Sequence, residues 1–564
     1  MLLTGGYQGS ETTRGILRIH PTSYENDTLR SLAPIDFNAP GASDRGDPVL
    51  VGLHTQKSFA NPVGTWEALV KVRRPRARDF VYEVQDDDWA YVGFSRFGRE
   101  TQVMLGLVDD VRRIRSVEGD GATTTTYKIS GSDHGKIFAI TPIWFDQLTD
   151  GALGLGAVGR ILGSQVGENP SRTVEKIIAG FIRASSTFGR GYWDLPNQVP
   201  LGTKGFFDPP SPTVPVRFLD ICSYFDTDFT DDPPRMAALG ASLFSNFNTS
   251  VWGLAEEWAD GSLCELYCDL MALYTSDVER EIDETRFATR YHGTDYCSDE
   301  FDPTNRNTYQ PVPAVIFRDR PFPTRSNKTF DEADSPFFTT IRQHFVSARE
   351  TPLIDVGRNG YARRNAFFVS PVMSRVFGTS AVQFARPVWK TDDIAKHGIR
   401  RLDVETNYVV PDLGNNEGVD KLAEIYRERL RDFHAPNHLW LDGQMTLPSG
   451  RPDIRIGTRL FVLGPDERVT ESYYVESVEH NWTYGHMTTT LGLSHGWIGS
   501  DDDLLKELRR VWSRYMIVTG EGAQLEEVQG GDILPPVPDP IPLTGTSNTA
   551  TTSTSGLDAS DLEE

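Results

Sequence analysis

The chain has 564 residues, enough for roughly three to four domains, and its 79 acidic and 56 basic side chains give a formal net charge of −23. So acidic a chain is a poor candidate for gripping nucleic acid or lying on an anionic membrane, because both partners would repel it. The 50 Gly, 35 Pro and 11% aromatic residues indicate many turns and enough aromatics for a core, which excludes a coiled coil, a collagen, a membrane channel and a fully disordered chain.

The sequence carries no recognisable membrane or secretion signal. No apolar run reaches the roughly 18 residues that span a bilayer, and residues 1–5 do not begin a secretory signal. The 4 Cys are too few for a disulfide scaffold in so long a chain. We therefore expect no stable membrane insertion, and synthesis in a reducing cytoplasm.

Alternating apolar and polar residues predict a series of short antiparallel strands in the first 145 residues, as in a barrel or sandwich. The predicted strands cover 14–20, 49–54, 65–73, 78–84, 90–97, 102–115 and 123–129. The acidic run Asp86, Asp87 and Asp88 lies between two of them. A solvated turn is favoured there over a cation site.

From about residue 146 the pattern changes to helices and long loops. Ser171 is a plausible N-cap for a helix whose apolar face is Val174, Ile177, Ile178, Phe181 and Ile182. A second helix is predicted near 236–244, after a loop region over 190–235 that is rich in Pro, Asp and Phe. Strand character returns over 262–270 and 313–318.

The remaining chain mixes both types before a polar tail. A helical pattern covers 331–349, a strand is predicted over 367–370, and an amphipathic helix over 419–432. Strands follow over 439–445, 459–462, 472–482 and 486–493, with Tyr484 and Gly485 as the last hairpin turn. A final helix over 504–512 is capped near Ser500 or Asp501. From about 518 the chain is Pro-rich, then Ser/Thr/Gly-rich, then acidic, which indicates a flexible tail that is either dispensable or a tether for a partner.

One glycine-rich segment fits a cofactor motif. Residues 154–159 match the dinucleotide fingerprint, and Glu175 has the offset of a ribose-binding acid. The fingerprint needs a strand that runs directly into it, but the strand-like segment 140–145 ends well before, and Glu175 falls inside a predicted helix. An apolar Gly loop is therefore favoured, and we predict no cofactor.

Other combinations of reactive residues also favour structural roles. Ser132, Asp133 and His134 are consecutive, so their side chains cannot converge as a catalytic triad requires. Cys264 and Cys268 lie on a predicted strand without a second ligand pair nearby, which argues against zinc.

The histidines and the charged runs also fit structural roles better than binding sites. Surface or core roles are favoured over a metal site for His480, His486 and His495, and pairing with acidic neighbours over phosphate contact for Arg73, Arg74, Arg76 and Arg78. Carboxylate pairs such as Glu256 and Glu257 cannot be told from solvated surface. Trp66, Trp89 and Trp252 fit either a core or an interface. The sequence thus predicts no catalytic, cofactor-binding or metal-ligating residue, and no enzyme.

Several segments together resemble the central hub protein of bacteriophage tail baseplates. The resemblance spans most of residues 14–498 and rests on the order and spacing of its pieces. These are 102–115 with 127–134, 314–322 with its apolar-x-Arg-x-x-Pro-Phe pattern, the short helix and Gly of 393–400, and the strands of 452–460, 473–480 and 488–496.

The resemblance implies a mainly β (α+β) fold with two tube-protein-like antiparallel β-barrels. The first barrel would occupy 1–145, completed by strands near 262–270 and 313–322, and 146–312 would be a helical and loop-rich insertion. Residues 313–435 would be a mixed α/β connection that contributes to the second barrel, which 436–498 would close. The helix of 499–517 and the tail of 518–564 would follow.

The implied role is structural. Three hub subunits form a ring whose six barrels match the six-fold tail tube, while the other end meets the three-fold spike and DNA passes through the channel without specific binding. Implied partners are the tail tube or tube-initiator protein and the central spike, with the baseplate wedge and tape-measure proteins as further candidates. The protein would assemble in the host bacterial cytoplasm and work in the virion.

Alternatives remain open at this point. The chain also fits a hub or tail-tip component of a non-contractile tail or a phage-like injection machine, and less well a β-rich cell-wall or polysaccharide hydrolase. The acidic excess has two readings: carboxylates that line the channel and repel passing DNA, or a solubilising outer surface.

Overall fold

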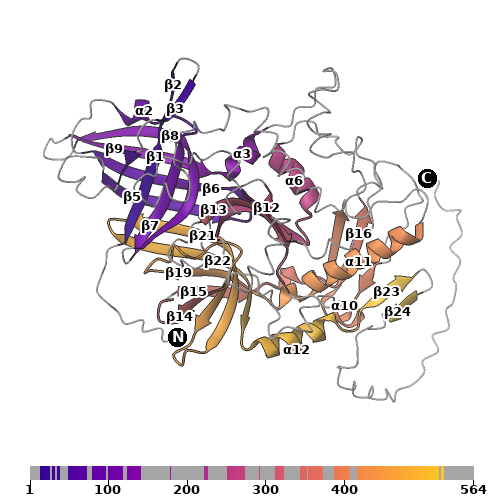
Figure 1. Cartoon of the computed structure of the whole chain (residues 1–564). Helices are drawn as coiled ribbons and strands as arrows, with labels where there is room; N and C mark the ends of the chain where they lie inside the picture. The colour runs from indigo at the N-terminus through magenta and orange to yellow at the C-terminus, as the bar shows by residue number, and fades with distance from the viewer. Residues whose placement is uncertain are drawn as a thin grey trace, which may run out of the picture. The chain divides into compact units, whose positions relative to one another are not determined.

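A computed structural model describes a large part of the chain (Figure 1). The described residues are 13–25, 28–31, 35–37, 49–72, 79–96, 99–117, 123–141, 174, 178, 222–226, 250–272, 291–292, 311–322, 343–351, 353–371, 387–406, 416–519 and 522–525. All of them belong to one compact unit, residues 1–525. No helix among the described residues is both long enough and apolar enough to cross a membrane.

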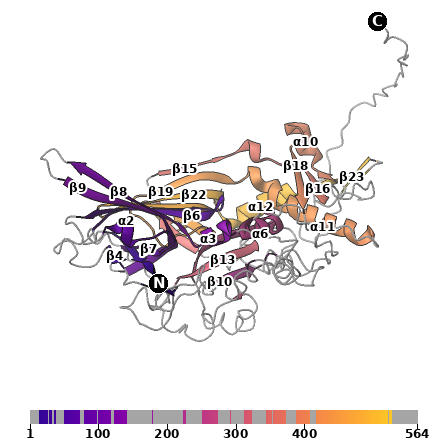
Figure 2. The same cartoon turned by 90° about the horizontal axis from the view of Figure 1, so that it is seen from above.

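A 13-stranded sheet dominates the fold. Its N-terminal half comprises β1 (Arg14–His20), β4 (Ile35–Asp36), β5 (Val49–Ser58), β6 (Asn61–Val72), β7 (Trp89–Arg96), β8 (Arg99–Val117) and β9 (Thr123–Asp133). Its C-terminal half comprises β14 (Gln343–Ser347), β15 (Leu353–Arg358), β19 (Leu441–Leu447), β20 (Arg459–Leu463), β21 (Val469–Thr483) and β22 (His486–Ile498). Figure 2 shows the two halves side by side.

The two halves join at one strand pair. The first part of β21 pairs with β20, and its last part pairs antiparallel with β5, from Ser477 opposite Ser58 to Thr483 opposite Gly52. The prediction of a mainly β fold with large antiparallel sheets is confirmed. Among the described strands, however, the hydrogen-bonded ladder is one branched sheet and not two closed barrels. A side chain also links β21 to the start of β1, because Trp482 Nε1 donates to the Thr13 carbonyl at 2.7 Å.

Smaller sheets surround the large one. β10 (Cys222–Asp226), β11 (Cys264–Ala272), β12 (Tyr291–His292) and β13 (Pro311–Asp319) form a four-stranded sheet. β16 (Ala366–Pro371), β17 (Val388–Trp389), β18 (Arg401–Thr406), β23 (Met516–Thr519) and β24 (Gly522–Leu525) form another, and β2 (Thr22–Glu25) pairs with β3 (Thr28–Ser31).

The described helices lie between these sheets and around them. They are α2 (Phe80–Glu83), α3 (Gly135–Ile140), α6 (Val251–Ala259), α10 (Thr391–His397), α11 (Asn416–His434) and α12 (Asp501–Trp512), with 3-10 turns η4 (Gly360–Ala362) and η5 (Ala435–His438). The core follows their apolar faces: Val174 and Ile178, one helical turn apart, are buried in the same cluster as the side chains of α3, α6 and β11. Trp66, Trp89 and Trp252 are buried as well, so within this chain they are core residues.

Local chemistry explains why several predictions succeed. Ser500 accepts a hydrogen bond from the Asp503 backbone N at 3.2 Å and begins α12, whose buried face is Leu504, Leu508, Val511 and Trp512. Tyr484 and Gly485 both have positive φ, at 49° and 85°, as a two-residue hairpin turn requires. The predicted helix over 419–432 lies inside α11, and the short helix that ends at Gly398 is α10.

Three local predictions are wrong. Within the predicted loop region over 190–235, Cys222–Asp226 form β10, which pairs in parallel with β13. The predicted strand over 78–84 contains α2, because the Asp79 side chain accepts from the Val81 backbone N and Phe80 is buried at the start of the turn. Within the predicted helix over 331–349, residues Gln343–Ser347 form β14, which pairs in parallel with β20. Its side chains alternate between buried and exposed, which suits a strand.

Some predictions fall partly or wholly outside the described residues. β23 and β24 form a hairpin up to Leu525, so regular structure extends into the first residues of the predicted tail. The glycine-rich segment 154–159 with Glu175, the helix near 236–244, the arginine run (Arg73, Arg74, Arg76 and Arg78) and the tail after 525 lie outside the described residues. The domain boundaries stay predictions.

Candidate functional site

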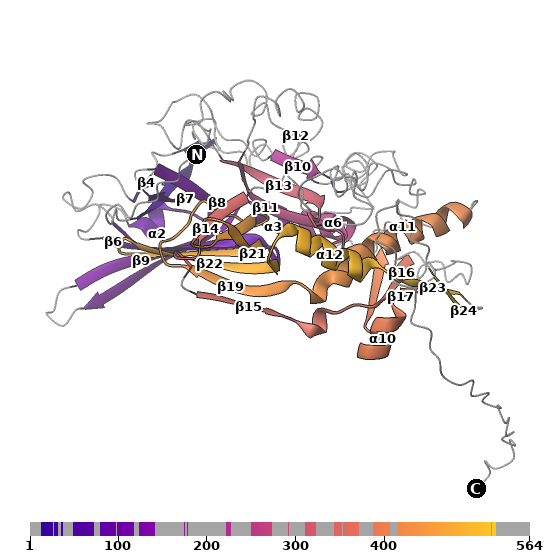
Figure 3. The same ribbon diagram turned by 90° about the horizontal axis from the view of Figure 1, so that it is seen from below.

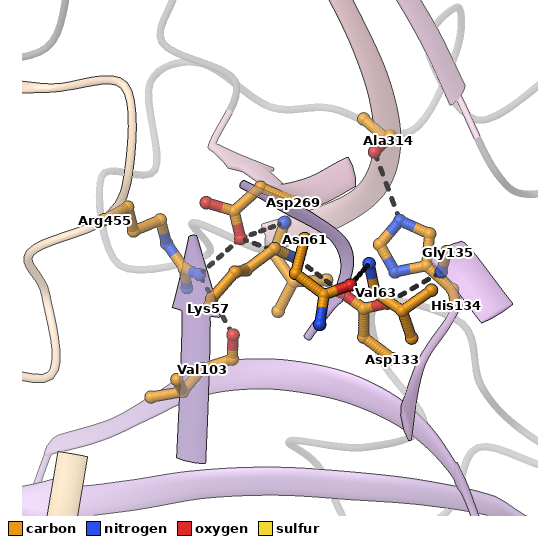
Figure 4. Close-up of polar contacts among 11 residues, drawn as sticks. Lys57, Asn61, Val63, Val103, Asp133, His134, Gly135, Asp269, Ala314 and Arg455 are labelled. Carbon is orange, nitrogen blue, oxygen red and sulfur yellow. Dashed lines mark hydrogen bonds and ion pairs between the residues drawn. The ribbon is translucent and has the colours of Figure 1, made fainter. Parts of the chain in front are cut away.

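A buried group of charged side chains lies where the halves of the large sheet meet the four-stranded sheet (Figure 4). Lys57 comes from the end of β5, Asp133 from the end of β9 and Asp269 from β11, while Arg455 lies between β19 and β20. We call these four residues the charged junction. They are distant in sequence, and the strand pairing described above brings them together.

Lys57 is the centre of the junction. Its Nζ donates to Asp133 Oδ2 at 2.5 Å and lies 3.7 Å from Asp269 Oδ1. The other oxygen of Asp133 accepts from the Gly135 backbone N at 2.9 Å, at the start of α3. A single lysine therefore connects β5, β9 and β11.

Arg455 completes the junction from the C-terminal half. Its Nη1 donates to Asp269 Oδ1 at 3.3 Å and to the Val103 carbonyl of β8 at 3.1 Å, and its Nη2 donates to the Gln102 carbonyl. Asp269 also accepts from the Leu270 backbone N at 2.7 Å. The arginine thus holds the C-terminal half against both β8 and β11.

The junction is electrostatically balanced. Burial opposes the charge on Lys57, but the carboxylates of Asp133 and Asp269 outweigh it and raise the pKa of the lysine, which stays protonated. Two cations thus face two carboxylates. Because a buried charge is costly unless it is paired, each member depends on the others.

Two titratable neighbours stay neutral beside it. Burial lowers the pKa of His134, whose Nε2 lies 3.1 Å from the Ala314 carbonyl of β13. A neutral imidazole with its proton on Nε2 donates this bond. Burial also raises the pKa of the Cys268 thiol well above its usual value, so this sulfur stays protonated and unreactive.

A second buried cluster ties the four-stranded sheet to β21. Arg318 of β13 donates to Glu265 Oε2 at 3.0 Å, to the Gly457 carbonyl at 2.9 Å and to the Tyr474 hydroxyl at 2.8 Å. The Tyr474 hydroxyl donates in turn to Glu265 at 2.6 Å. Together the two clusters fix β11 and β13 against both halves of the large sheet.

The chemistry of these clusters is that of a fixed framework. Their charges are paired, their carboxylates accept from firmly placed donors, and the one thiol in contact is buried and protonated. In the described ranges, no three His, Cys, Asp or Glu side chains gather as a metal-binding group. The arrangement is suited to holding two sheets in a fixed geometry.

The residues weighed in the sequence have separate partners in the structure. Ser132 donates to Asp109, Asp133 binds Lys57 and His134 contacts Ala314, so the three do not converge. Cys264 and Cys268 are buried thiols on β11, and the Cys264 Sγ donates to Asp319 Oδ1 at 3.6 Å.

The three histidines of the last hairpin also lie in three separate environments. His480 is buried against Thr489 at 2.9 Å, His486 is exposed, and His495 stacks on Phe322. The acidic run divides as well, because Asp86 and Asp87 are exposed while Asp88 is buried and accepts from the Gln85 backbone N. Glu256 is exposed on α6.

Sequence reasoning missed the members of the junction other than Asp133. Lys57 lies beyond the predicted strand over 49–54, Asp269 lies within the predicted strand over 262–270, and Arg455 lies in a segment that carries only part of the resemblance. A charged residue at an inward-facing strand position was the available signal, but nothing local identifies its partner.

Comparisons with known proteins give distant structural neighbours only. No family model and no curated protein matches the sequence. Among solved structures, the 43 kDa tail protein of prophage MuSo2 from Shewanella oneidensis has a TM-score of 0.40 and 11% identity, covering 86% of this chain and 98% of that chain. A tail protein from Neisseria meningitidis MC58 has a TM-score of 0.38 and 10% identity, covering 85% and 96%.

A third neighbour comes from a secretion machine. An E. coli protein described as a component of the type VI secretion system has a TM-score of 0.32 and 9% identity, covering 80% of this chain and 74% of that chain. The structural neighbours are therefore phage tail proteins and a type VI secretion component.

Proposed function

We propose that this chain is a structural virion protein, the central hub of a phage tail baseplate, and that it works without catalysis. Three copies form a ring that adapts the six-fold tail tube to a three-fold spike and leaves a channel for DNA. The partners are the tube or tube-initiator protein and the central spike, and baseplate wedge and tape-measure proteins are further contacts. The proposal rests on the ordered sequence resemblance and on the fold, and not on the distant TM-scores.

The observation that carries the proposal is the pairing of β5 with β21. It joins two half-sheets, antiparallel except for the β14–β20 pair and each with a long hairpin (β8–β9 and β21–β22), into one sheet within one chain. Three such chains would supply six half-sheets around one axis. A trimer built in this way can match a six-fold tube at one end and a three-fold spike at the other while keeping closed symmetry.

The charged junction supports the same role. A hub transmits force between tube and spike, so its two halves must keep a fixed relation. Buried ion pairs connect β5, β9 and β11 to the segment before β20, and a hydrogen bond from Arg455 connects that segment to β8. A buried polar network whose members are all paired makes a core rigid and selects one arrangement of its elements.

Electron microscopy of the purified protein tests the proposal. We expect ring-shaped particles with three-fold symmetry and an open central channel. Compact monomers at all concentrations, or particles with a deep carboxylate-lined cleft and hydrolytic activity on cell-wall material, would overturn it.

The acidic balance leads to a separate test of DNA passage. If part of the −23 charge lines the channel, like-charge repulsion keeps the DNA from sticking. Lysine substitutions at the acids that face the channel in such a ring should slow DNA ejection after normal assembly. Unchanged infectivity would assign the excess charge to the outer surface instead.

A further inference from the structure

One face of the large sheet carries no buried side chain along a continuous line of paired residues. Residues directly opposite each other on paired strands share a face of the sheet. From Leu353 of β15 the register passes to Thr446 of β19, Thr490 of β22, Glu479 of β21 and Gln56 of β5. Each of these five residues is half-buried or exposed.

The same face continues through the N-terminal half. His54, the next residue of β5 on that face, is opposite Glu67 of β6, which is opposite Ser130 of β9 and through it Asp110 of β8. Ile114 lies on this face four residues after Asp110, and all five residues are half-buried or exposed. We call this side of the eight strands from β15 to β8 the open face.

Each edge strand presents one exposed apolar side chain on the open face. On β15 this residue is Leu353, which is 58% exposed, and on β8 it is Ile114, which is 49% exposed. The neighbours Ile354 and Val356 of β15 pack against the core on the other side of the sheet. Two apolar side chains thus lie in water at opposite ends of a mostly polar face.

Both edge strands have an unpaired outer backbone among the described residues. β15 pairs with β19 alone of the described strands. The ladder between β8 and β7 ends at Leu107, the backbone of Asp87 and Asp88 pairs with Val108, and beyond it β9 is the one described strand that pairs with β8. Figure 3 shows β15 beyond β19 at the margin of the sheet, and Figure 2 shows the β8–β9 hairpin projecting from it. The N–H and C=O groups of such an edge are a template for a further strand.

The strand directions at the two edges are complementary. Each of the seven pairs between β15 and β8 is antiparallel, so the direction alternates along the series. With eight strands, β15 and β8 therefore run in opposite directions. When β8 of one copy lies beside β15 of another, with the open faces on the same side, the new pair is antiparallel too, and the alternation continues from copy to copy.

We propose that the outer part of β8, residues 109–117, pairs with β15 of the next copy and brings Ile114 near Leu353. The second copy supplies the missing strand with the right direction, the matching face and the second exposed apolar side chain. Because the two edges differ, the contact is heterologous, and a heterologous contact produces a ring when its rotation closes. The inference rests on the proposed ring and names the strands that join its subunits.

Charge does not select this contact. Both edges carry charges of mixed sign, which are Asp110, Arg112, Arg113 and Arg115 on β8, and Asp355 and Arg358 on β15. Arg112 pairs with Asp110 and Arg113 pairs with Asp79 within the chain. Recognition rests instead on backbone hydrogen bonds and on the apolar pair, as it does when an extended segment is added to the edge of a sheet.

Engineered cysteine pairs test the contact in the full-length protein. Ile114→Cys is combined in turn with Leu353→Cys, Asp355→Cys and Gly357→Cys, three successive positions on the open face of β15. A disulfide joins residues whose Cα atoms lie within about 7 Å, whereas six strands, spaced about 4.8 Å apart, separate β15 from β8 within one chain. A disulfide between these positions therefore links two copies. On mild oxidation, we expect at least one pair to give covalent oligomers up to the trimer on a non-reducing gel.

Matched variants measure background cross-linking. Ile114→Cys/Thr65→Cys places the second cysteine on the open face of β6, in the middle of the sheet, where Thr65 is exposed, and should give no covalent oligomers. Wild-type protein reports on the native thiols, of which Cys264 and Cys268 are buried. Cross-linking of the control as strong as that of the β15 pairs would overturn the docking.

Sedimentation velocity of lysine variants provides an independent measurement. Ile114→Lys and Leu353→Lys should each weaken self-association by about tenfold or more, because a charge replaces an apolar side chain that the contact buries. Thr65→Lys makes the same change in the middle of the sheet and should leave association unchanged. Circular dichroism verifies that each variant is folded. Equal effects of all three substitutions would overturn the contact.

The outcomes separate this contact from the proposed function. Three-fold rings that form without a cross-link at any of the three β15 positions would overturn the contact and leave the hub proposal standing. Cross-linked series that continue past the trimer would support the contact and overturn the trimeric ring. Monomers under every condition, without cross-links, would overturn both.

Discussion

Replacing Lys57 with methionine tests whether the charged junction holds the fold together. The substitution keeps most of the side-chain volume but leaves Asp133, which is fully buried, without its cation, and Asp269 with Arg455 alone. Removing one partner of a buried ion pair costs about 3–5 kcal/mol. We therefore expect the free energy of unfolding to fall by about that amount.

A matched lysine provides the control. Lys128 and Glu67 are 2.6 Å apart, nearly the same as the 2.5 Å between Lys57 and Asp133, but their side chains are 38% and 40% exposed. Exposed pairs contribute about 0–1 kcal/mol, so Lys128→Met should change little. The two variants thus differ in burial while the contact distance is held constant.

Urea unfolding followed by tryptophan fluorescence measures both variants. The transition midpoints are comparable where the slopes agree. The double variant Lys57→Met/Asp133→Asn should be more stable than Lys57→Met, because it removes the unpaired carboxylate. The reasoning would be refuted if Lys57→Met unfolded like Lys128→Met, or if the double variant were no more stable than the single one.

The remaining predictions concern acid stability, packing and a helix cap. Burial lowers the pKa values of His20, His434 and His438 to about 4 and that of His480 to about 3. The unfolded chain, whose histidines titrate near 6.5, therefore binds protons first, and the free energy of unfolding should be full above that pH and fall steadily from there toward pH 4. His480→Gln should flatten this decline in pH-dependent unfolding, and an unchanged slope would contradict it. Gly131→Ala should cost about 1–3 kcal/mol in thermal unfolding, because its Cβ would meet the Leu107 carbonyl and the Trp66 ring, whereas Gly261→Ala meets nothing within 4 Å and serves as the control. Ser500→Ala should cost about 1 kcal/mol through the loss of the α12 cap, and Ser500→Thr should retain most of it; equal losses in both would count against a capping role.

Local patterns in the sequence were sufficient for many elements. The strands within β1, β5–β9 and β19–β22 and the helices α11 and α12 have periodicity, caps and turns that act over a few residues, so the sequence alone indicates them. Where a local signal competed with the environment, prediction failed. The segment around Phe80 became a helix through the Asp79 cap, and Gln343–Ser347 became a strand because β20 offered a parallel partner.

The sequence by itself determined that this is a mainly β, acidic chain. Its helical insertion, its tail and the phage tail hub that it resembles stay predictions. Only the tertiary structure decided that β5 pairs with β21, that one sheet branches across both halves, and that Lys57 meets Asp133 across 76 residues of sequence. The physical reason is that a strand's pattern specifies which face is buried but not which edge it joins. A buried charge likewise requires a partner, and only the folded chain selects which one.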